Sequence, residues 1–301
     1  MCGRLKSSMP RITTDDDVGL FFEETGDGFP IIFVHEFAGD YRSFYPQVSF
    51  FSHQYRCITY CARGYTPSDV PSLVSSYSQE RARDDIRSIL DALSIEQAHI
   101  IGISMGSFAA LHFGISDPKR VRSLVLGGCG SGSPLAVREK FRNEARMMAN
   151  AIHQVGMETV AAAYAESATR VQFQKKDPNG WMEFRQMLSE HSGLGSANTM
   201  LGVQAKRPSL FEIEEDLTVL SVPTLVMVGD EDEPCLEVSL YLKRTIPSSG
   251  LVFFPITGHT LNLEEPNLFN ATVSRFLHQV ELNCWPQRDP RSLTGRIITS
   301  R

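Results

Sequence analysis

Short apolar runs alternate with segments of helical character along most of the chain. The runs cover residues 20–24, 30–35, 56–60, 98–103, 122–128, 223–229 and 250–255. Most are continuous stretches of strand length, which is typical of parallel strands buried on both faces. Between them, residues 78–95 begin at a serine and carry an Ile/Leu stripe, and residues 265–280 have a proline in their first turn. This alternation predicts an α/β protein with a mostly parallel, doubly wound sheet.

One long segment breaks this rhythm. From about residue 130 to about residue 216 no convincing strand pattern is present, and the sequence is helical in character and rich in Met, Ala and Phe. We therefore expect a core domain formed by residues 1–133 and 217–301 and a helical cap formed by residues 134–216. A stripe of Met147, Met148, Phe184 and Met187 is a candidate lining for a substrate pocket. The alternative, that the stripe packs the cap on itself, stays open at this stage.

The composition excludes several classes of function. Of the 301 residues, 42% are hydrophobic and 21% charged, which is enough apolar material for a large core. The formal net charge of −6 argues against a nucleic-acid partner and offers no cationic field to a membrane. No run approaches the roughly 18 apolar residues of a membrane span, and residues 1–17 have no apolar stretch of the kind that a secretory signal needs.

The cysteines are scattered rather than grouped. They form no C-x-x-C pair and no short Cys/His spacing, so the sequence gives no sign of a zinc site. This usage fits a reducing compartment, and we expect a cytoplasmic protein. The six positions are Cys2, Cys57, Cys61, Cys129, Cys235 and Cys284.

A serine flanked by glycines follows one of the predicted strands. Gly102-Ile103-Ser104-Met105-Gly106 matches the pattern G-x-S-x-G, lies after the apolar run 98–103 and opens a helical segment. A turn this sharp requires small residues two positions before and two after the serine. We therefore predict that Ser104 is a nucleophile and that the backbone N–H of Met105, at the start of the new helix, faces a developing oxyanion. The alternative is an ordinary loop serine.

A serine nucleophile needs a base, and the base needs an acid. His259 lies just beyond the run 250–255 and before the last helical segment, at the edge of the sheet where Ser104 is expected. The acid should follow another strand, and the stretch after Gly229 supplies several. We choose Asp232, because it lies far enough beyond the strand to turn back toward His259, whereas Asp230 more often caps such a turn. The chain order Ser, Asp, His is that of α/β hydrolases.

A second oxyanion donor is expected in the loop after the run 30–35, which reads HEFAGD. We predict that the backbone N–H of Phe37 points into the site and that His35 braces this loop by a side-chain hydrogen bond. A carboxylate facing an oxyanion would oppose catalysis, so we expect Glu36 to point away from the site.

Together these segments resemble the α/β-hydrolase superfamily, in its branch of cap-bearing enzymes with a serine nucleophile. The similarity covers nearly the whole chain, through residues 20–40, 60–71, 102–107, 229–234 and 257–266. Three features depart from the usual pattern: Glu36 replaces the glycine of a His-Gly pair, Tyr65-Thr66-Pro67 interrupts the loop written R-G-x-G-x-S, and Ser107 replaces a commoner glycine. Epoxide hydrolases and haloalkane dehalogenases of this fold use an aspartate nucleophile, so Ser104 argues against both.

The resemblance implies hydrolysis of a small, largely apolar carboxylic ester through an acyl-enzyme, with Ser104, His259 and Asp232 as the triad and no metal or organic cofactor. The partner would be a small-molecule substrate, and the oligomeric state is left open. The same triad also serves carbon–carbon bond hydrolases, lactonases and cofactor-free haloperoxidases. A ligand receptor that uses the fold as a cage is an alternative from a different class, since fold does not settle function.

Overall fold

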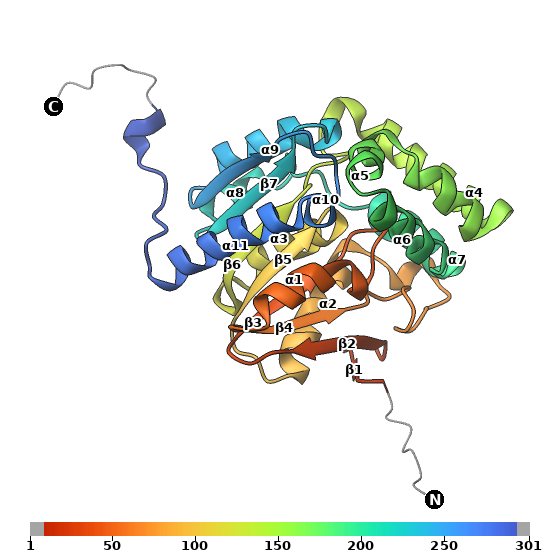
Figure 1. The fold of residues 1–301 in the computed structure, drawn as a ribbon, viewed down its shortest axis with the longest axis horizontal. Coiled ribbons are helices and arrows are strands. Elements are labelled where there is room, and N and C mark those ends of the chain that lie inside the picture. The colour runs from red at the N-terminus through yellow and green to blue at the C-terminus, as the bar shows by residue number, and fades with distance from the viewer. Residues whose placement is uncertain (1–8, 294–301) are drawn as a thin grey trace, which may run out of the picture.

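The computed structural model describes residues 9–293 of the chain (Figure 1). Residues 1–8, on which the expected absence of a secretory signal partly rests, lie outside this range. Within it the chain forms one eight-stranded sheet in the order β1-β2-β4-β3-β5-β6-β7-β8. The strands are β1 (Arg11–Thr13), β2 (Gly19–Thr25), β3 (Phe29–Val34), β4 (Tyr55–Tyr60), β5 (Ala98–Ile103), β6 (Val121–Gly127), β7 (Thr224–Gly229) and β8 (Ser249–Phe254).

The predicted α/β-hydrolase fold is confirmed. From β4 to β8 all neighbouring strands pair in parallel, and only β1 with β2 and β2 with β4 pair antiparallel. Each of the seven apolar runs became a strand. The strand that the sequence did not reveal is β1, which has three residues and buries only Ile12, so it shows no continuous apolar run.

Alternate residues of the central strands enter two different hydrophobic clusters, as the period of two of a strand requires. Ile32 of β3 packs with the helices α2 (Gln79–Ala92), α3 (Met105–Ser116) and α9 (Glu233–Thr245). Its neighbour Phe33 packs with α1 (Tyr45–Phe51) and α11 (Pro266–Glu281) on the opposite face. The sheet is therefore covered on both faces, which explains why its strands are continuously apolar.

A helical region is inserted between β6 and β7. No strand forms between Gly128 and Pro223, a stretch that the structure describes completely. The insertion contains α4 (Arg138–Ala165), α5 (Val171–Lys176), α6 (Pro178–Ser189), α7 (Gly193–Thr199), a π-helical turn η6 (Met200–Gln204) and α8 (Glu214–Val219). Its helices α4 to α7 group at one edge of the molecule (green in Figure 1). Helix α4 is broken at Gly156. The short helix α10 (Leu261–Glu264) lies outside the insertion, in the segment after β8.

The end of the insertion packs into the main core. Leu210 and Leu217 are buried in the same cluster as Ile32 and Ile100, whereas Trp181 and Phe184 belong to a second cluster that joins the inserted helices to the core loops around Phe37. Leu210 thus packs with the core, and the boundary of the cap at residue 216 stays a prediction. Among residues 9–293, no helix combines the length and apolar character needed to cross a membrane.

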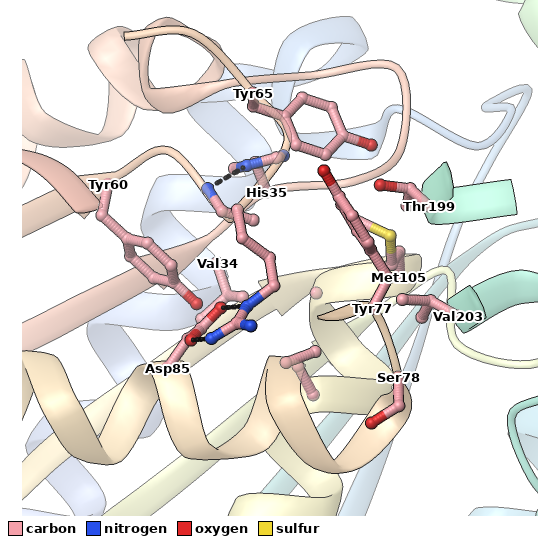
Figure 2. Close-up of a pocket in the computed structure, with 15 residues that line it drawn as sticks. Val34, His35, Tyr60, Tyr65, Tyr77, Ser78, Asp85, Met105, Thr199 and Val203 are labelled. Carbon is pink, nitrogen blue, oxygen red and sulfur yellow. Dashed lines mark hydrogen bonds and ion pairs between the residues drawn. The ribbon is translucent and has the colours of Figure 1, made fainter. Parts of the chain in front are cut away.

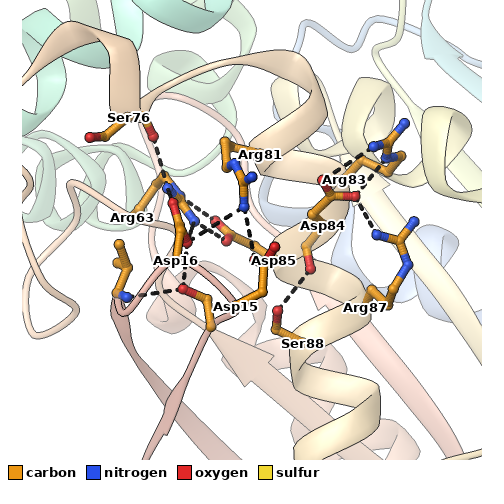
Figure 3. Close-up of polar contacts among 12 residues, drawn as sticks. Asp15, Asp16, Arg63, Ser76, Arg81, Arg83, Asp84, Asp85, Arg87 and Ser88 are labelled. Carbon is orange, nitrogen blue, oxygen red and sulfur yellow. Dashed lines mark hydrogen bonds and ion pairs between the residues drawn. The ribbon is translucent and has the colours of Figure 1, made fainter.

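A buried arginine ties the loop after β4 to the rest of the core (Figure 3). Arg63, only 4% exposed, donates from Nε and Nη2 to both oxygens of the buried Asp85 in α2, at 3.0 and 2.6 Å. It also donates to Asp16 in the turn between β1 and β2, at 2.7 and 2.9 Å. The carboxylates of Asp16 and Asp85 compensate the buried guanidinium, so three segments far apart in sequence are fixed together.

We predict that Arg63→Leu lowers the free energy of unfolding by about 3–5 kcal/mol, because it leaves the Asp85 carboxylate buried without its counter-charge. Urea unfolding monitored by circular dichroism measures this loss. Replacing both residues, in Arg63→Leu/Asp85→Leu, should recover part of it.

Arg56→Leu is the matched control, since Arg56 forms an exposed pair with Glu24 on the surface. Removing such a pair should cost less than about 1 kcal/mol. Equal losses for the two single variants would contradict the assigned role of Arg63.

Candidate active site

Ser104 lies in a sharp turn between β5 and α3. Its φ of 51° and ψ of −114° place a non-glycine residue in a sparsely populated region, which costs on the order of 1–3 kcal/mol. The turn is anchored by the Ser104 N–H, which donates to the carbonyl of Gly127 at 2.7 Å. Backbone strain of this kind persists only where the surrounding structure holds it, and it is concentrated at functional sites.

The two flanking glycines are required by close backbone contacts. A Cβ atom on Gly102 would lie 2.5 Å from the backbone of Gly106, and a Cβ on Gly106 would lie 2.0 Å from the carbonyl oxygen of Val34 at the end of β3. Ser107, which replaces a commoner glycine, has its hydroxyl 2.8 Å from the Gly102 carbonyl and 2.9 Å from that of Gly127. The serine thus braces the turn.

His259 and Asp232 form a buried hydrogen-bonded pair. His259 Nδ1 lies 2.7 Å from Asp232 Oδ2, and the two residues are 6% and 0% exposed. Burial opposes the charge on Asp232, but the His259 ring beside it outweighs this and holds the pKa of the carboxyl below its ordinary value. Asp230, the rival acid, instead accepts the backbone N–H of Thr257 at 3.1 Å. The structure therefore brings the acid chosen from the sequence to His259.

His35 fixes the orientation of the peptide bond between Glu36 and Phe37. Its Nε2 accepts the Ala62 N–H at 3.0 Å, so its Nδ1 must carry the proton that is donated to the Glu36 carbonyl at 2.7 Å. Gly39 N–H donates to the same carbonyl at 3.2 Å. Since the C=O and N–H of a peptide point in opposite directions, holding the Glu36 carbonyl fixes the direction of the Phe37 N–H. The expected brace by His35 is present.

Tyr65 supports the same loop from the other side. Its hydroxyl donates to the Phe37 carbonyl at 3.0 Å, and its ring meets the His35 ring edge to face at 4.6 Å. Both side chains, with Met105, line a small pocket (Figure 2), whose volume is about 30 Å³. Ser104 does not line this space, which is large enough for about one water molecule. Tyr65, one of the departures from the family loop, is therefore part of the scaffold of the site.

Glu36 is neutralised by an arginine from the inserted region. Arg170 is 0% exposed, and its Nη1 and Nη2 donate to the two carboxylate oxygens of Glu36, at 3.2 and 2.5 Å. Arg170 Nη1 also donates to the hydroxyl of Thr260 at 2.9 Å, and the His259 N–H donates to the carbonyl of Thr169 at 3.1 Å. The pair joins the loop of Phe37, the insertion and the loop of His259, and it gives Glu36 a partner.

A cavity of about 180 Å³ opens beside Ser104 and His259. It is smaller than the about 300–1,000 Å³ typical of pockets for drug-sized ligands, which suits a small substrate. Its lining combines residues of the core with residues of α4 and the π-helical turn. These residues are Phe37, Ser104, Ser131, Phe141, Glu144, Ala145, Met148, Tyr164, Met200, Gln204, Arg207 and His259.

Of the side chains predicted to form the pocket, one lines this cavity. Met148 lines it, but Phe184 and Met187 do not. Phe184 is 1% exposed and packs against Phe173, with ring centroids 5.9 Å apart, while Met147 is 69% exposed on the outside of α4. The pocket assignment of Phe184 and Met187 is thus corrected: the buried face of α6, which carries Phe184, packs against α4 and α5 instead of lining the cavity of Ser104.

Arg170 and Arg207 were not found from the sequence. Neither belongs to a recognisable motif, Arg207 directly following Lys206, and no spacing rule connects either arginine to a residue more than 50 positions away. Only the folded chain brings Arg170 to Glu36 and Arg207 to the cavity of Ser104.

Three side chains near the pair have atoms of the kind that bind metals. The ligand atoms of Asp232, Cys235 and His259 lie within 4.8 Å of one another. Burial keeps the pKa of the Cys235 thiol well above its ordinary value, and Cys235 Sγ lies 3.3 Å from the carbonyl of Gly128. A protonated thiol that donates to a carbonyl is a poor metal ligand.

The profile of the alpha/beta hydrolase fold family matches residues 30–266, and the chain belongs to this family. It is 27% identical to 3-oxoadipate enol-lactonase 1 of Acinetobacter baylyi over 253 residues, which covers 83% of this chain and 89% of the relative. It is also 27% identical to a 2-hydroxy-6-oxononadienedioate/2-hydroxy-6-oxononatrienedioate hydrolase of Pseudomonas putida over 277 residues, covering 87% and 92%.

A thermophilic esterase from Thermogutta terrifontis, solved with malate bound, has a similar structure with a TM-score of 0.81 at 27% identity. The match covers 91% of this chain and 99% of the esterase. The chain is therefore a hydrolase of the α/β fold, and the proteins it resembles include an enol-lactonase and an esterase.

We predict that acid destabilises the protein through His35. Burial lowers the pKa of His35 from 6.5 to about 4, so between these values the unfolded chain binds a proton that the folded chain does not. The free energy of unfolding should therefore fall as the pH drops from about 6.5 to about 4, with His35 contributing about 3 kcal/mol. Urea unfolding at several pH values in this window measures the slope.

His35→Asn keeps a donor for the Glu36 carbonyl but removes the titrating ring. Its stability at pH 7 should be lower than that of the wild type, and its decline between pH 6.5 and 4 should be shallower. An unchanged slope would contradict the role of His35.

Proposed function

We propose that the protein hydrolyses a small carboxylic ester through an acyl-enzyme formed on Ser104. The observation that carries this proposal is the strained turn of Ser104 beside the buried His259–Asp232 pair, at one cavity. A receptor that only held a ligand would have no need for a serine whose backbone costs free energy. The strain therefore favours the enzyme over the receptor.

In the first half of the reaction, Ser104 Oγ attacks the ester carbonyl carbon while His259 Nε2 accepts the hydroxyl proton. The N–H groups of Phe37 and Met105 stabilise the negative charge on the carbonyl oxygen. The bond to the alcohol oxygen then breaks, and His259 delivers the proton to that oxygen. Asp232 keeps Nδ1 protonated and stabilises the cationic ring.

In the second half, a water molecule attacks the acyl-enzyme and gives a proton to His259. The bond to Ser104 Oγ breaks, and His259 returns this proton to the serine. One ester and one water give one acid and one alcohol, so the proposed reaction needs neither metal nor organic cofactor. Lactones are cyclic esters and fit the same steps, so a lactone is the second substrate class to be screened.

We infer a reducing compartment such as the cytoplasm for this reaction. Cys57, Cys61, Cys129 and Cys235 are buried free thiols, and the structure shows them without disulfide partners in residues 9–293. This supports the expectation from the sequence, and the partner in the proposal is the small-molecule substrate.

Ser104→Ala should reduce kcat for a short-chain p-nitrophenyl ester by at least about 10⁴-fold, because no other group replaces the nucleophile. Wild-type protein should be labelled at Ser104 by a small phosphonate, as peptide mass spectrometry would show. Labelling at a different serine, or turnover that persists in the alanine variant, would refute the proposal.

Asp232→Asn should reduce kcat by about 10³–10⁴-fold, since an amide at this place favours the wrong tautomer of His259. Asp230→Asn is the matched control, because its amide oxygen still accepts the Thr257 N–H and it does not contact His259. Its kcat should stay within about threefold of the wild type. The assignment of the acid fails if the two variants lose equal activity.

A further inference from the structure

Arg207 is the buried arginine that lacks a carboxylate partner. In the described part of the chain four arginines are buried, and three of them have an acid within 4 Å: Arg63 has Asp85, Arg170 has Glu36, and Arg138 has Glu212 at 3.7 Å. Arg207 is 3% exposed and forms no ion pair among residues 9–293. An uncompensated buried charge is costly, so its retention calls for a ligand of opposite charge.

The guanidinium of Arg207 is held in a fixed orientation. Its Nη1 donates to Gln204 Oε1 and its Nη2 to the Ser131 carbonyl, each at 2.5 Å. Its Cζ lies 3.7 Å from the centre of the Phe108 ring and 5.1 Å from that of Phe141. An arginine has five N–H donors, so these two hydrogen bonds leave three without a protein acceptor in the described residues.

Arg207 lies where its three remaining N–H donors can bind a ligand in the cavity of Ser104. Arg207, Ser131 and Gln204 all line the cavity that Ser104 and His259 share, and Gln204 ends the π-helical turn. π-helical turns are frequent at functional sites. Burial lowers the pKa of the guanidinium to about 10, so it remains charged at neutral pH. Glu144 also lines the cavity, but it is exposed and lies 3.8 Å from Lys140.

We propose that the substrate carries a carboxylate group, which Arg207 binds while Ser104 attacks the ester elsewhere in the same molecule. This proposal rests on the hydrolase function above and narrows its substrate class from small esters to anionic ones. A guanidinium and a carboxylate have opposite charges, and both are planar groups that can form two parallel hydrogen bonds. The apolar side chains of the wall, Phe37, Phe141 and Met148, would contact the part of the substrate between the two groups.

Two pairs of nearly isosteric esters test the proposal. The first is methyl hydrogen glutarate against methyl glutaramate, with the charge on the acyl side. The second is acetoxyacetate against acetoxyacetamide, with the charge on the alcohol side. In at least one pair, the wild type should prefer the anionic member by tenfold or more in kcat/KM, because hydrogen bonds to charged groups are the strong ones. A ratio near one in both pairs would overturn the proposal.

Arg207→Met should bring the preferred ratio down to about one or below, and Arg207→Lys should give an intermediate value. Arg146→Met is the matched control, because this substitution removes the same charge. Arg146 is exposed on α4 and does not line the cavity. Its ratio should equal that of the wild type. If Arg207 only clamped the wall, the anionic and neutral members would lose activity equally, and the proposal would be wrong.

Binding without turnover separates this inference from the proposed function. In calorimetry, Ser104→Ala protein should bind the anionic member of at least one of the two ester pairs at least tenfold more tightly than the neutral member. This measurement does not require Arg207→Met to fold. Equal binding within both pairs would overturn the role of Arg207. Failure of every ester and of phosphonate labelling in the wild type would instead refute the esterase, whatever the binding measurements show.

Discussion

The contact between Gly106 and the end of β3 is the constraint on which the site depends. The backbone of α3 approaches the Val34 carbonyl so closely that a single methyl group at Gly106 would lie 2.0 Å from it. This approach holds Ser104 in its strained turn and sets the start of α3 beside the loop of Phe37. The donors proposed for the oxyanion come from two segments that are distant in sequence, and their spacing follows from this one contact.

Buried charge organises the loops around that turn. Arg63 fixes the loop that carries Tyr65, and Tyr65 and His35 in turn hold the backbone on both sides of Phe37. Arg170 joins Glu36 to Thr260, next to His259. Each ion pair is expensive to break, because removing one partner leaves a charge in the interior. The loops at the carboxyl ends of the strands are therefore rigid where the proposed chemistry requires fixed geometry.

The core and the insertion have different roles in the proposed reaction. Residues proposed for bond cleavage lie on loops of the sheet, whereas Met148, Gln204 and Arg207 of the insertion complete the cavity wall. Such a division would allow relatives named as an enol-lactonase, a 2-hydroxy-6-oxononadienedioate hydrolase and an esterase to share one fold. Substitutions in the cavity wall would change which substrate is bound beside Ser104, while Ser104, His259 and the residues that support them stay the same.

The sequence by itself determined seven of the eight strands, the inserted helical region and the pairing of Asp232 with His259. These features depend on local patterns, namely continuous apolar runs, small residues around Ser104, and acids and histidines just after strands. The sequence missed β1, which has too few buried residues to leave a pattern. It also misjudged Phe184, since a helix's apolar stripe does not say whether it faces the cavity or its own neighbours. Only the tertiary structure decided which arginine meets Glu36 and which enters the cavity, because those distances are set by packing between segments that no local period relates.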